Sequence, residues 1–170
     1  YGYSAYELRD GSGGLDAHTH PDDLAQMALD RQAHFDGRSP MYFNERRIRC
    51  KDGNWKWIMS RGMVLSRDEQ GRPMRMVGIH TDITQRKNAE VLIWQQANFD
   101  ALTGLPNRRM LHDRLEQAIK RSDRDALPLA VLFIDLDHFK EINDSLGHHQ
   151  GDALLMQAAL RICQTVRNSD

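Results

Sequence analysis

Two aspartates, Asp135 and Asp137, stand directly after an apolar run in the stretch FIDLDHFKEINDSLGHHQGD at residues 133–152. A carboxylate at the C-terminal end of a buried strand is well placed to hold Mg²⁺, which prefers hard oxygen ligands. Taken alone, the Asp-Leu-Asp run also fits a helix N-cap after a strand. A second polar group follows across one short helix and a glycine turn: Asn143, Asp144, His148, His149 and Asp152. The two histidines suggest a metal, but their place at a turn favours structural hydrogen bonds.

The composition is that of an ordinary water-soluble globular protein. Of the 170 residues, 40% are hydrophobic and 28% are charged, and the formal net charge is −1. This balance gives no reason to expect nucleic-acid binding. The longest apolar stretch, Leu127 to Ile134, contains Pro128 and is far too short to cross a bilayer. We therefore expect no membrane segment in this chain.

The two cysteines and the N-terminal residues indicate the cellular compartment in which the protein is expected. Cys50 and Cys163 match no metal or redox spacing, so we expect ordinary thiols in a reducing compartment. No secretory signal opens the chain. The sequence therefore favours a cytoplasmic location, and leaves open whether the whole protein is anchored in a membrane ahead of this segment.

The first half predicts a helix followed by three strands. Pro21 suits a first helical turn, and Gly37 is a plausible end of that helix. The strands are expected at residues 41–50, 55–66 and 74–84. Between the first two, Asp52-Gly53 predicts a type I′ hairpin turn. Along the second strand a stripe of large side chains shares one face and predicts a core or an interface more than a cofactor site: Trp55, Trp57 and Met59.

The second half predicts helices around one buried strand. A helical linker is expected at residues 84–99, and a further helix at about residues 107–121. The near-continuous apolar run LPLAVLFID, residues 127–135, predicts a strand buried on both faces. A short helix from Phe139 to Leu146 should end at Gly147, and a last helix should run from Gly151 to near Asn168. The predicted fold class is α+β followed by α/β.

Two family resemblances become visible at these residues. The strings YGYSAYEL, HPDD, RIRCKDGNWKWI and GIHTDITQRK resemble the C-terminal part of a PAS sensor domain with its PAC motif. The strings FDALTGLPNRRML and LAVLFIDLDHFKEINDSLGHHQGDALL resemble the first half of a GGDEF domain, the diguanylate cyclase catalytic domain. The implied domains are a PAS/PAC domain at residues 1–84, a signalling helix at 85–99, and the N-terminal half of a GGDEF domain at 100–170.

The sequence departs from both families in one respect each. The first strands of a PAS sheet should precede the GYS segment, and no GGDEF or GGEEF string occurs in the chain. We therefore expect a piece of a larger protein that makes no cyclic di-GMP by itself. The resemblance implies that the parent protein joins two GTP molecules, with Mg²⁺, in a homodimer.

The resemblance also assigns roles to residues of this chain. It implies that Asp135 and the main-chain carbonyl of Leu136 hold the metal, and that Asn143 and Asp152 recognise guanine. The start of the helix at His138 and Phe139 can hold phosphate oxygens. Lys140 can add a positive charge there, although a solvated lysine is about as good an interpretation.

The sensor half gives fewer assignments. Asp82 and Thr84 resemble the junction at which PAS strands pass into an output helix, and either can cap that helix. The sequence leaves the PAS ligand unknown. His34 and His80 are conceivable haem ligands, but ordinary structural histidines are strongly preferred.

Two rival functions stay open from the sequence. The motifs DLDHFKEINDSLGHHQGDALL and LTGLPNRR also resemble GGDEF domains that precede an EAL domain. In such proteins the GGDEF part can be a GTP-binding regulator of a cyclic di-GMP phosphodiesterase. The chain can also be a sensing and dimerisation module alone.

Overall fold

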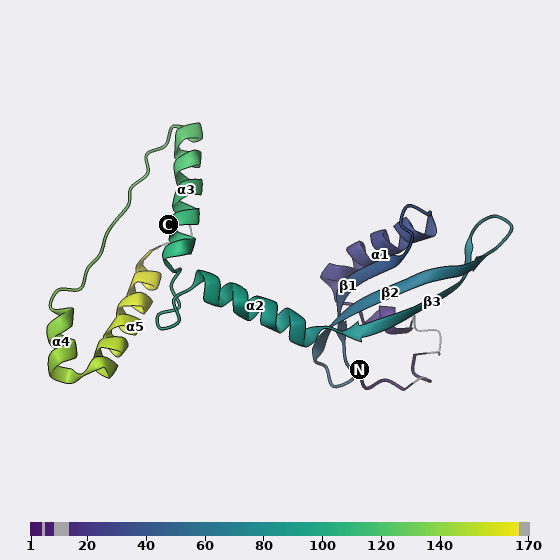
Figure 1. Cartoon of the computed structure of the whole chain (residues 1–170), viewed down its shortest axis with the longest axis horizontal. Coiled ribbons are helices and arrows are strands. Elements are labelled where there is room, and N and C mark those ends of the chain that lie inside the picture. The colour runs from purple at the N-terminus through teal and green to yellow at the C-terminus, as the bar shows by residue number, and fades with distance from the viewer. Residues whose placement is uncertain (5, 9–13, 167–170) are drawn as a thin grey trace. The chain divides into compact units, whose positions relative to one another are not determined.

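The computed structural model describes residues 1–4, 6–8 and 14–166. The chain divides into two compact units, Tyr1–Glu90 and Val91–Asp170 (Figure 1). The first unit holds a 3-10 helix, one α-helix and three strands: η1 Gly14–His18, α1 Pro21–Phe35, β1 Tyr42–Arg49, β2 Trp55–Arg67 and β3 Pro73–Asp82. Helix α2, Thr84–Asn98, crosses the boundary between the units. The second unit continues with α3 Arg108–Asp125, α4 Phe139–Leu146 and α5 His148–Thr165.

The first unit is a three-stranded antiparallel sheet with α1 packed on one face (Figure 1). The strand order is β1-β2-β3, so each strand pairs with its neighbour in the sequence. Side chains alternate between the two faces, and every second residue of β1 from Tyr42 is buried toward α1. The other face, which begins with Phe43, is the outer face. The three predicted strands are confirmed.

Local signals set the ends of α1. Pro21 occupies the first turn, and the side chain of His20 accepts a hydrogen bond from the Asp22 N–H. Gly37 follows the helix with a φ of 74°, a conformation that L side chains rarely adopt, so the helix ends where the glycine predicts.

The hairpin between β1 and β2 is confirmed, but its predicted turn type is wrong. The Gly53 N–H donates to the carbonyl of Cys50, which places Lys51 and Asp52 at the centre of the turn. Gly53 then has a φ of 88°, whereas Asp52 does not have a positive φ. The single glycine supplies the left-handed residue after the turn, and the Asp52 side chain accepts from the Asn54 N–H instead.

The tryptophan face of β2 is not the core. Ile58 and Ser60 are buried toward α1, while Trp55 is 43% exposed on the outer face. Trp57, on the same outer face, lies between two cations: the Arg47 guanidinium is 5.5 Å and the Lys87 ammonium 5.1 Å from its ring centroid. Of the two predicted roles for this stripe, a core and an interface, the structure excludes the core.

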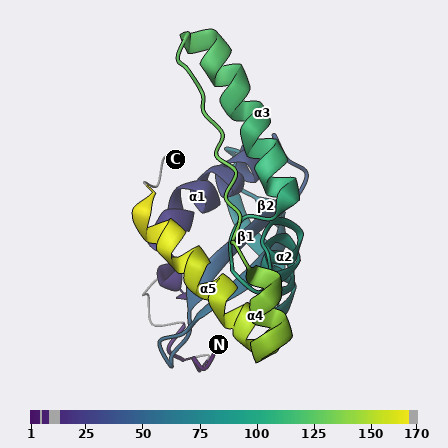
Figure 2. The same ribbon diagram turned by 90° about the vertical axis from the view of Figure 1, so that its left-hand side faces the viewer.

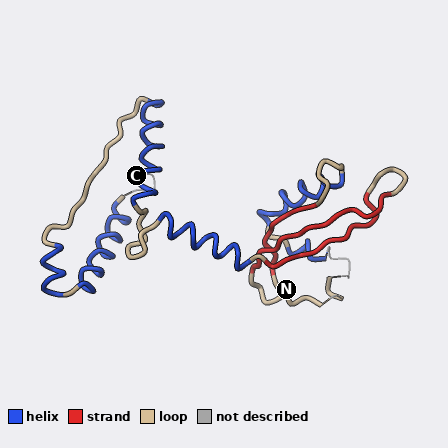
Figure 3. Tube along the Cα trace, in the orientation of Figure 1, coloured by secondary structure: helices blue, strands red, loops and turns tan. Residues whose placement is uncertain are grey.

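The second unit is helical, and the strand predicted at residues 127–135 was wrong. The segment between α3 and α4 has no strand assignment and stays a loop (Figure 3). Its apolar side chains are exposed, with Phe133 at 95% and Leu132 at 81%. A strand needs a hydrogen-bonding neighbour, and the described part of this unit supplies no other strand. Apolar composition alone therefore does not make one here.

Two helices follow that loop and are joined by a short turn at Gly147 (Figure 2). Helix α4 has the predicted bounds. Helix α5 begins at His148 rather than at the predicted Gly151, because the Gly151 N–H already bonds back to the carbonyl of Gly147. The predicted end near Asn168 lies outside the described residues. Among the described helices, none combines the length and the hydropathy that a membrane span requires.

Candidate functional site

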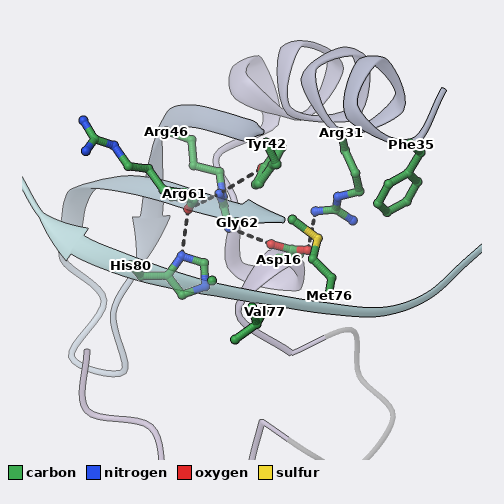
Figure 4. Close-up of a pocket in the computed structure, with 12 residues that line it drawn as sticks. Asp16, Arg31, Phe35, Tyr42, Arg46, Arg61, Gly62, Met76, Val77 and His80 are labelled. Atoms are coloured by element: carbon green, nitrogen blue, oxygen red, sulfur yellow. Dashed lines mark hydrogen bonds and ion pairs between the residues drawn. The ribbon is translucent and has the colours of Figure 1, made fainter. Parts of the chain in front are cut away.

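A cavity of about 300 Å³ lies in the first unit between α1 and the inner face of the sheet (Figure 4). Polar side chains from η1, α1 and all three strands line it: Asp16, Arg31, Tyr42, Arg46, Ser60 and His80. Its apolar side chains are those of Phe35 and Met76, whereas the side chain of Val77 points to the outer face of the sheet, as its pairing with Met63 requires (Figure 4). Gly62 and Gly78 pair across β2 and β3 and both line the cavity, so this part of the wall is main chain.

A buried arginine organises the polar wall. The side chain of Arg46 is 1% exposed, and all three of its nitrogens donate hydrogen bonds. Nε donates to Thr19 at 3.2 Å, and Nη1 donates to Ser60 Oγ at 2.7 Å. Nη2 donates to Asp16 Oδ1 at 2.6 Å, which pairs the buried cation with a carboxylate. A buried charge is tolerated only with such partners, so this network is fixed in the folded unit.

Arg31 approaches the same carboxylate from α1. Its Nη2 donates to Asp16 Oδ2, and its guanidinium lies 5.9 Å from the Tyr42 ring centroid. Burial acts to lower the pKa of Arg31, but the Asp16 carboxylate outweighs it and raises that pKa. Burial raises the pKa of the Tyr42 hydroxyl, which therefore stays protonated. The side chain of Arg31 is 32% exposed, in contrast to the sealed Arg46.

The two histidines considered as haem ligands have different surroundings. His34 engages both ring nitrogens, one with the carbonyl of Ser39 at 2.9 Å and the other with the Val64 N–H at 3.0 Å. It therefore joins α1 to β2, as the structural interpretation predicts. His80 lines the cavity, and its Nδ1 is 2.7 Å from Ser60 Oγ. Burial, together with the neighbouring Arg46 cation, lowers the pKa of His80, so its ring is neutral at pH 7.

The predicted junction residues Asp82 and Thr84 do connect the sheet to α2. Asp82 Oδ1 accepts from the Thr84 N–H at 2.9 Å, which caps the helix, and Oδ2 accepts from Lys56 Nζ at 2.9 Å. Hydrogen bonds from Thr84 and from Lys56 hold the pKa of Asp82 at about 2. Thr84 Oγ1 in turn accepts from the Trp57 N–H at 3.0 Å. The first turn of α2 is therefore bonded directly to β2.

A second set of contacts holds α2 from the outer face of the sheet. The Glu45 carboxylate on β1 accepts from Arg86 at 2.5 Å and from Lys87 at 2.7 Å. These bonds lower the pKa of Glu45. Glu45 directly precedes Arg46 in β1, and the two side chains point to opposite faces of the sheet. Arg46 faces the cavity, whereas Glu45 binds α2. Sequence reasoning missed this contact.

In the second unit, the predicted metal and phosphate residues lie at the start of α4. Asp135 is exposed, and the Leu136 carbonyl accepts from the Phe139 N–H at 3.3 Å. This bond engages one predicted phosphate donor and leaves the carbonyl a second lone pair. His138 precedes the helix with a φ of 58°, and its Nδ1 is 2.8 Å from Glu141 Oε1. Lys140 is exposed.

The two predicted guanine-binding residues are brought together by the α4–α5 turn. Gly151 is buried, and a Cβ built on it would lie 1.9 Å from Asn143 Oδ1. The Asn143 side chain therefore fills the space that any larger residue at 151 would need. Asp152 follows directly and is exposed. His148 and His149 are exposed at the start of α5.

The donor set at the start of α4 fits half of a magnesium site. Mg²⁺ usually takes one or two carboxylates together with phosphate oxygens and water. Asp135 and the Leu136 carbonyl supply hard oxygens of the right kind, and within the described residues no group of three His, Cys, Asp or Glu side chains could hold a metal. These oxygens suit an ion that arrives with nucleotide phosphates.

The charged lining of the cavity was not predicted from the sequence. The sequence does contain an indication of this charged lining, because Arg46 lies on the same face of β1 as the buried residues Tyr42, Asn44 and Ile48. A charged residue in phase with buried ones indicates a buried ion pair. Its partner Asp16 lies 30 residues earlier, and nothing local connects the two.

Comparison with protein families decides what the two units are. Residues 1–80 match the PAS fold family, and residues 97–170 match the family described as diguanylate cyclase, GGDEF domain. The chain is a PAS domain followed by part of a GGDEF domain. The structure of the first unit, an antiparallel sheet with helices, agrees with the predicted α+β class for the PAS domain.

Individual relatives match about half of this chain or nearly all of it. The bifunctional diguanylate cyclase/cyclic di-GMP phosphodiesterase MucR of Pseudomonas aeruginosa is 54% identical over 85 residues, which are 50% of this chain and 12% of MucR. Diguanylate cyclase TpbB of the same species is 48% identical over 86 residues, 51% of this chain and 19% of TpbB. The uncharacterized protein y4lL of Sinorhizobium fredii is 38% identical across 94% of this chain, which spans 20% of y4lL.

Among solved structures, a sensory box histidine kinase/response regulator from Burkholderia thailandensis matches with a TM-score of 0.46 and 32% identity. The match covers 68% of this chain and 73% of that one. The family match and the similarity to TpbB relate the PAS–GGDEF chain to diguanylate cyclases, and the chain spans 12–20% of the length of these three curated relatives.

Proposed function

We propose that this chain is the sensor-to-output section of a cyclic di-GMP signalling protein. The PAS domain detects a small molecule, α2 carries the change, and the GGDEF part contributes to a GTP site. The observation that supports it most is the packing of Asn143 of α4 against Gly151, the residue directly before Asp152. The proposed metal residues Asp135 and Leu136 precede the N-terminus of α4.

In the proposed site each part of the nucleotide meets a different set of groups. Asn143 and Asp152 complement the guanine edge, since a carboxylate can accept from the N1–H and the exocyclic amine together. The main chain at His138, with the charge of Lys140, holds phosphate. Asp135 and the Leu136 carbonyl hold Mg²⁺, which when bound neutralises phosphate charge for attack by a ribose hydroxyl. Two such domains of a homodimer must face each other to join two GTP molecules.

The chain alone is proposed to be inactive. No GGDEF or GGEEF string occurs in its 170 residues, so an expected acidic metal ligand is absent from it. Incubation of the chain with GTP and Mg²⁺ should yield no cyclic di-GMP, and measurable product would contradict this.

GTP titration of a chain extended through a complete GGDEF domain tests the site. Asp152→Ala should weaken GTP binding about tenfold or more, because it removes a charge-assisted hydrogen-bond acceptor. Asp144→Ala is the matched control, since Asp144 is equally acidic and exposed on the neighbouring helix. Unchanged GTP affinity in Asp152→Ala would overturn the proposed guanine contact.

A second candidate is a regulatory GTP-binding GGDEF part within a phosphodiesterase. It is favoured by the name of MucR and by cyclic di-GMP phosphodiesterase NbdA of P. aeruginosa, which is 43% identical over 88 residues. An EAL motif in the parent gene and hydrolysis of cyclic di-GMP by the parent protein would select this candidate. A chain that binds no GTP in the extended form would instead be a sensing and dimerisation module alone.

The domain boundaries also stay a proposal: residues 1–84 for the PAS/PAC domain, 85–99 for the linker and 100–170 for the GGDEF part. Asp82 and Thr84 are the proposed coupling residues, because their bonds join β2 to the first turn of α2. Inserting one residue near Ala89 in the parent protein should uncouple signal from output, and an unchanged response would count against this role.

A further inference from the structure

We propose that the cavity of the PAS domain binds a small organic carboxylate. The ligand is a monoanion whose charged end meets Arg31 and whose apolar end lies against Phe35 and Met76. This inference names the ligand class of the sensor, and it rests on the proposed sensing function.

The positive charge of the cavity wall favours a ligand with one negative charge. Among the described residues of the wall, the guanidinium groups of Arg31 and Arg46 face one carboxylate, that of Asp16. His80 is neutral, as its lowered pKa requires. The guanidinium of Arg61 points away from the cavity and lies 5.6 Å from the Phe43 ring centroid on the outer face (Figure 4). The described part of the wall is therefore left with one positive charge in excess.

Arg31 is the cation that can meet the ligand. Arg46 is sealed and uses Nε, Nη1 and Nη2 on protein acceptors. Arg31 is 32% exposed and donates to Asp16 through Nη2, so its fork of five N–H donors reaches both the carboxylate and the open side of the cavity. A guanidinium pairs with a carboxylate through two parallel hydrogen bonds, which gives a planar anion the advantage.

The remaining wall selects a small ligand with an apolar body. A volume of about 300 Å³ is at the small end of ligand sites. Phe35 and Met76 offer no charge, and Gly62 and Gly78 add no side chain to the sheet side of the cavity. A phosphate dianion is disfavoured, because its second charge would face Asp16 without a cation.

Isothermal titration of the 170-residue chain with benzoate tests the proposal, with no nucleotide present. We expect saturable binding, and at least tenfold weaker binding of benzamide, the neutral analogue of similar shape, and of inorganic phosphate. Arg31→Gln should weaken benzoate about ten- to hundredfold. Arg38→Gln is the matched control, because Arg38 is 65% exposed and pairs with Asp36 just beyond α1. It should bind benzoate like the unmodified chain.

Amide chemical shifts of the unmodified chain keep the proposal testable if Arg31→Gln fails to fold. Benzoate should perturb the amides of Arg31, Phe35 and residues 76–78. Absence of binding, equal affinity for benzamide or phosphate, full affinity in Arg31→Gln, or perturbations confined to other residues would each overturn the proposal. Because GTP is not used, these failures are separate from a failure of the GGDEF site.

Discussion

The strand-to-helix junction gives a prediction in which two substitutions at one position separate two interactions. Asp82→Ala removes both the cap on the Thr84 N–H and the ion pair with Lys56. Asp82→Asn keeps an acceptor oxygen for the cap and removes only the charge. The cap contributes about 1 kcal/mol. The ion pair contributes about 0.5 kcal/mol, because its side chains are 44% and 40% exposed and solvent screens them.

The expected losses in the free energy of unfolding are therefore about 1.5 kcal/mol for Asp82→Ala and about 0.5 kcal/mol for Asp82→Asn. For a unit of this size these correspond to drops in Tm of about 6–12 °C and about 2–4 °C. Urea unfolding followed by tryptophan fluorescence measures both. A Trp94→Phe background leaves Trp55 and Trp57 of β2 as the reporters.

The pH dependence has a definite sign. The folded-state pKa of Asp82 is about 2, below its ordinary 3.8, so its charge favours the folded state. The stabilisation is complete above about pH 4 and is lost as the pH falls from about 4 to about 2. The difference between the unmodified chain and Asp82→Asn should vanish at the lower limit. Equal losses for the two substitutions, or a difference that persists at pH 2, would refute this account.

Three further substitutions test other contacts. Glu45→Gln should cost about 1 kcal/mol, because it weakens two partly exposed ion pairs to α2, and should speed amide exchange in the first turn of α2; unchanged exchange would count against the contact. Asp16→Asn should cost about 3 kcal/mol in urea unfolding, since it leaves the buried Arg46 without its carboxylate, and a loss below about 1 kcal/mol would contradict that. Gly151→Ala should displace the Asn143 amide and lower GTP affinity of a complete GGDEF domain about tenfold with helicity unchanged; normal GTP binding would show that the amide is not needed.

Elements with local signals were predictable from the sequence. Pro21 and Gly37 mark the ends of α1, and the β1–β2 hairpin follows from Asp52-Gly53 even though its turn type does not. These signals act through backbone geometry within a few residues, so they need no knowledge of the rest of the chain.

The wrong and missed predictions concern features that depend on residues far away in the sequence. The apolar run at residues 127–135 is strand-like only if another strand lies beside it, and none does in the described part of its unit. The cavity depends on Arg46 meeting a carboxylate 30 residues away, which no local pattern reports. The nucleotide residues were proposed from a family motif, and their roles stay a prediction.

The alternation of β1 has a consequence for redesigning this protein. Arg46 faces the cavity, while its neighbour Glu45 holds α2 from the opposite side of the sheet. Residues of the proposed ligand site can therefore be exchanged without changing those that hold the linker. A chimera that replaces only the inward-facing positions of β1 and α1 should respond to a different molecule and keep its original output.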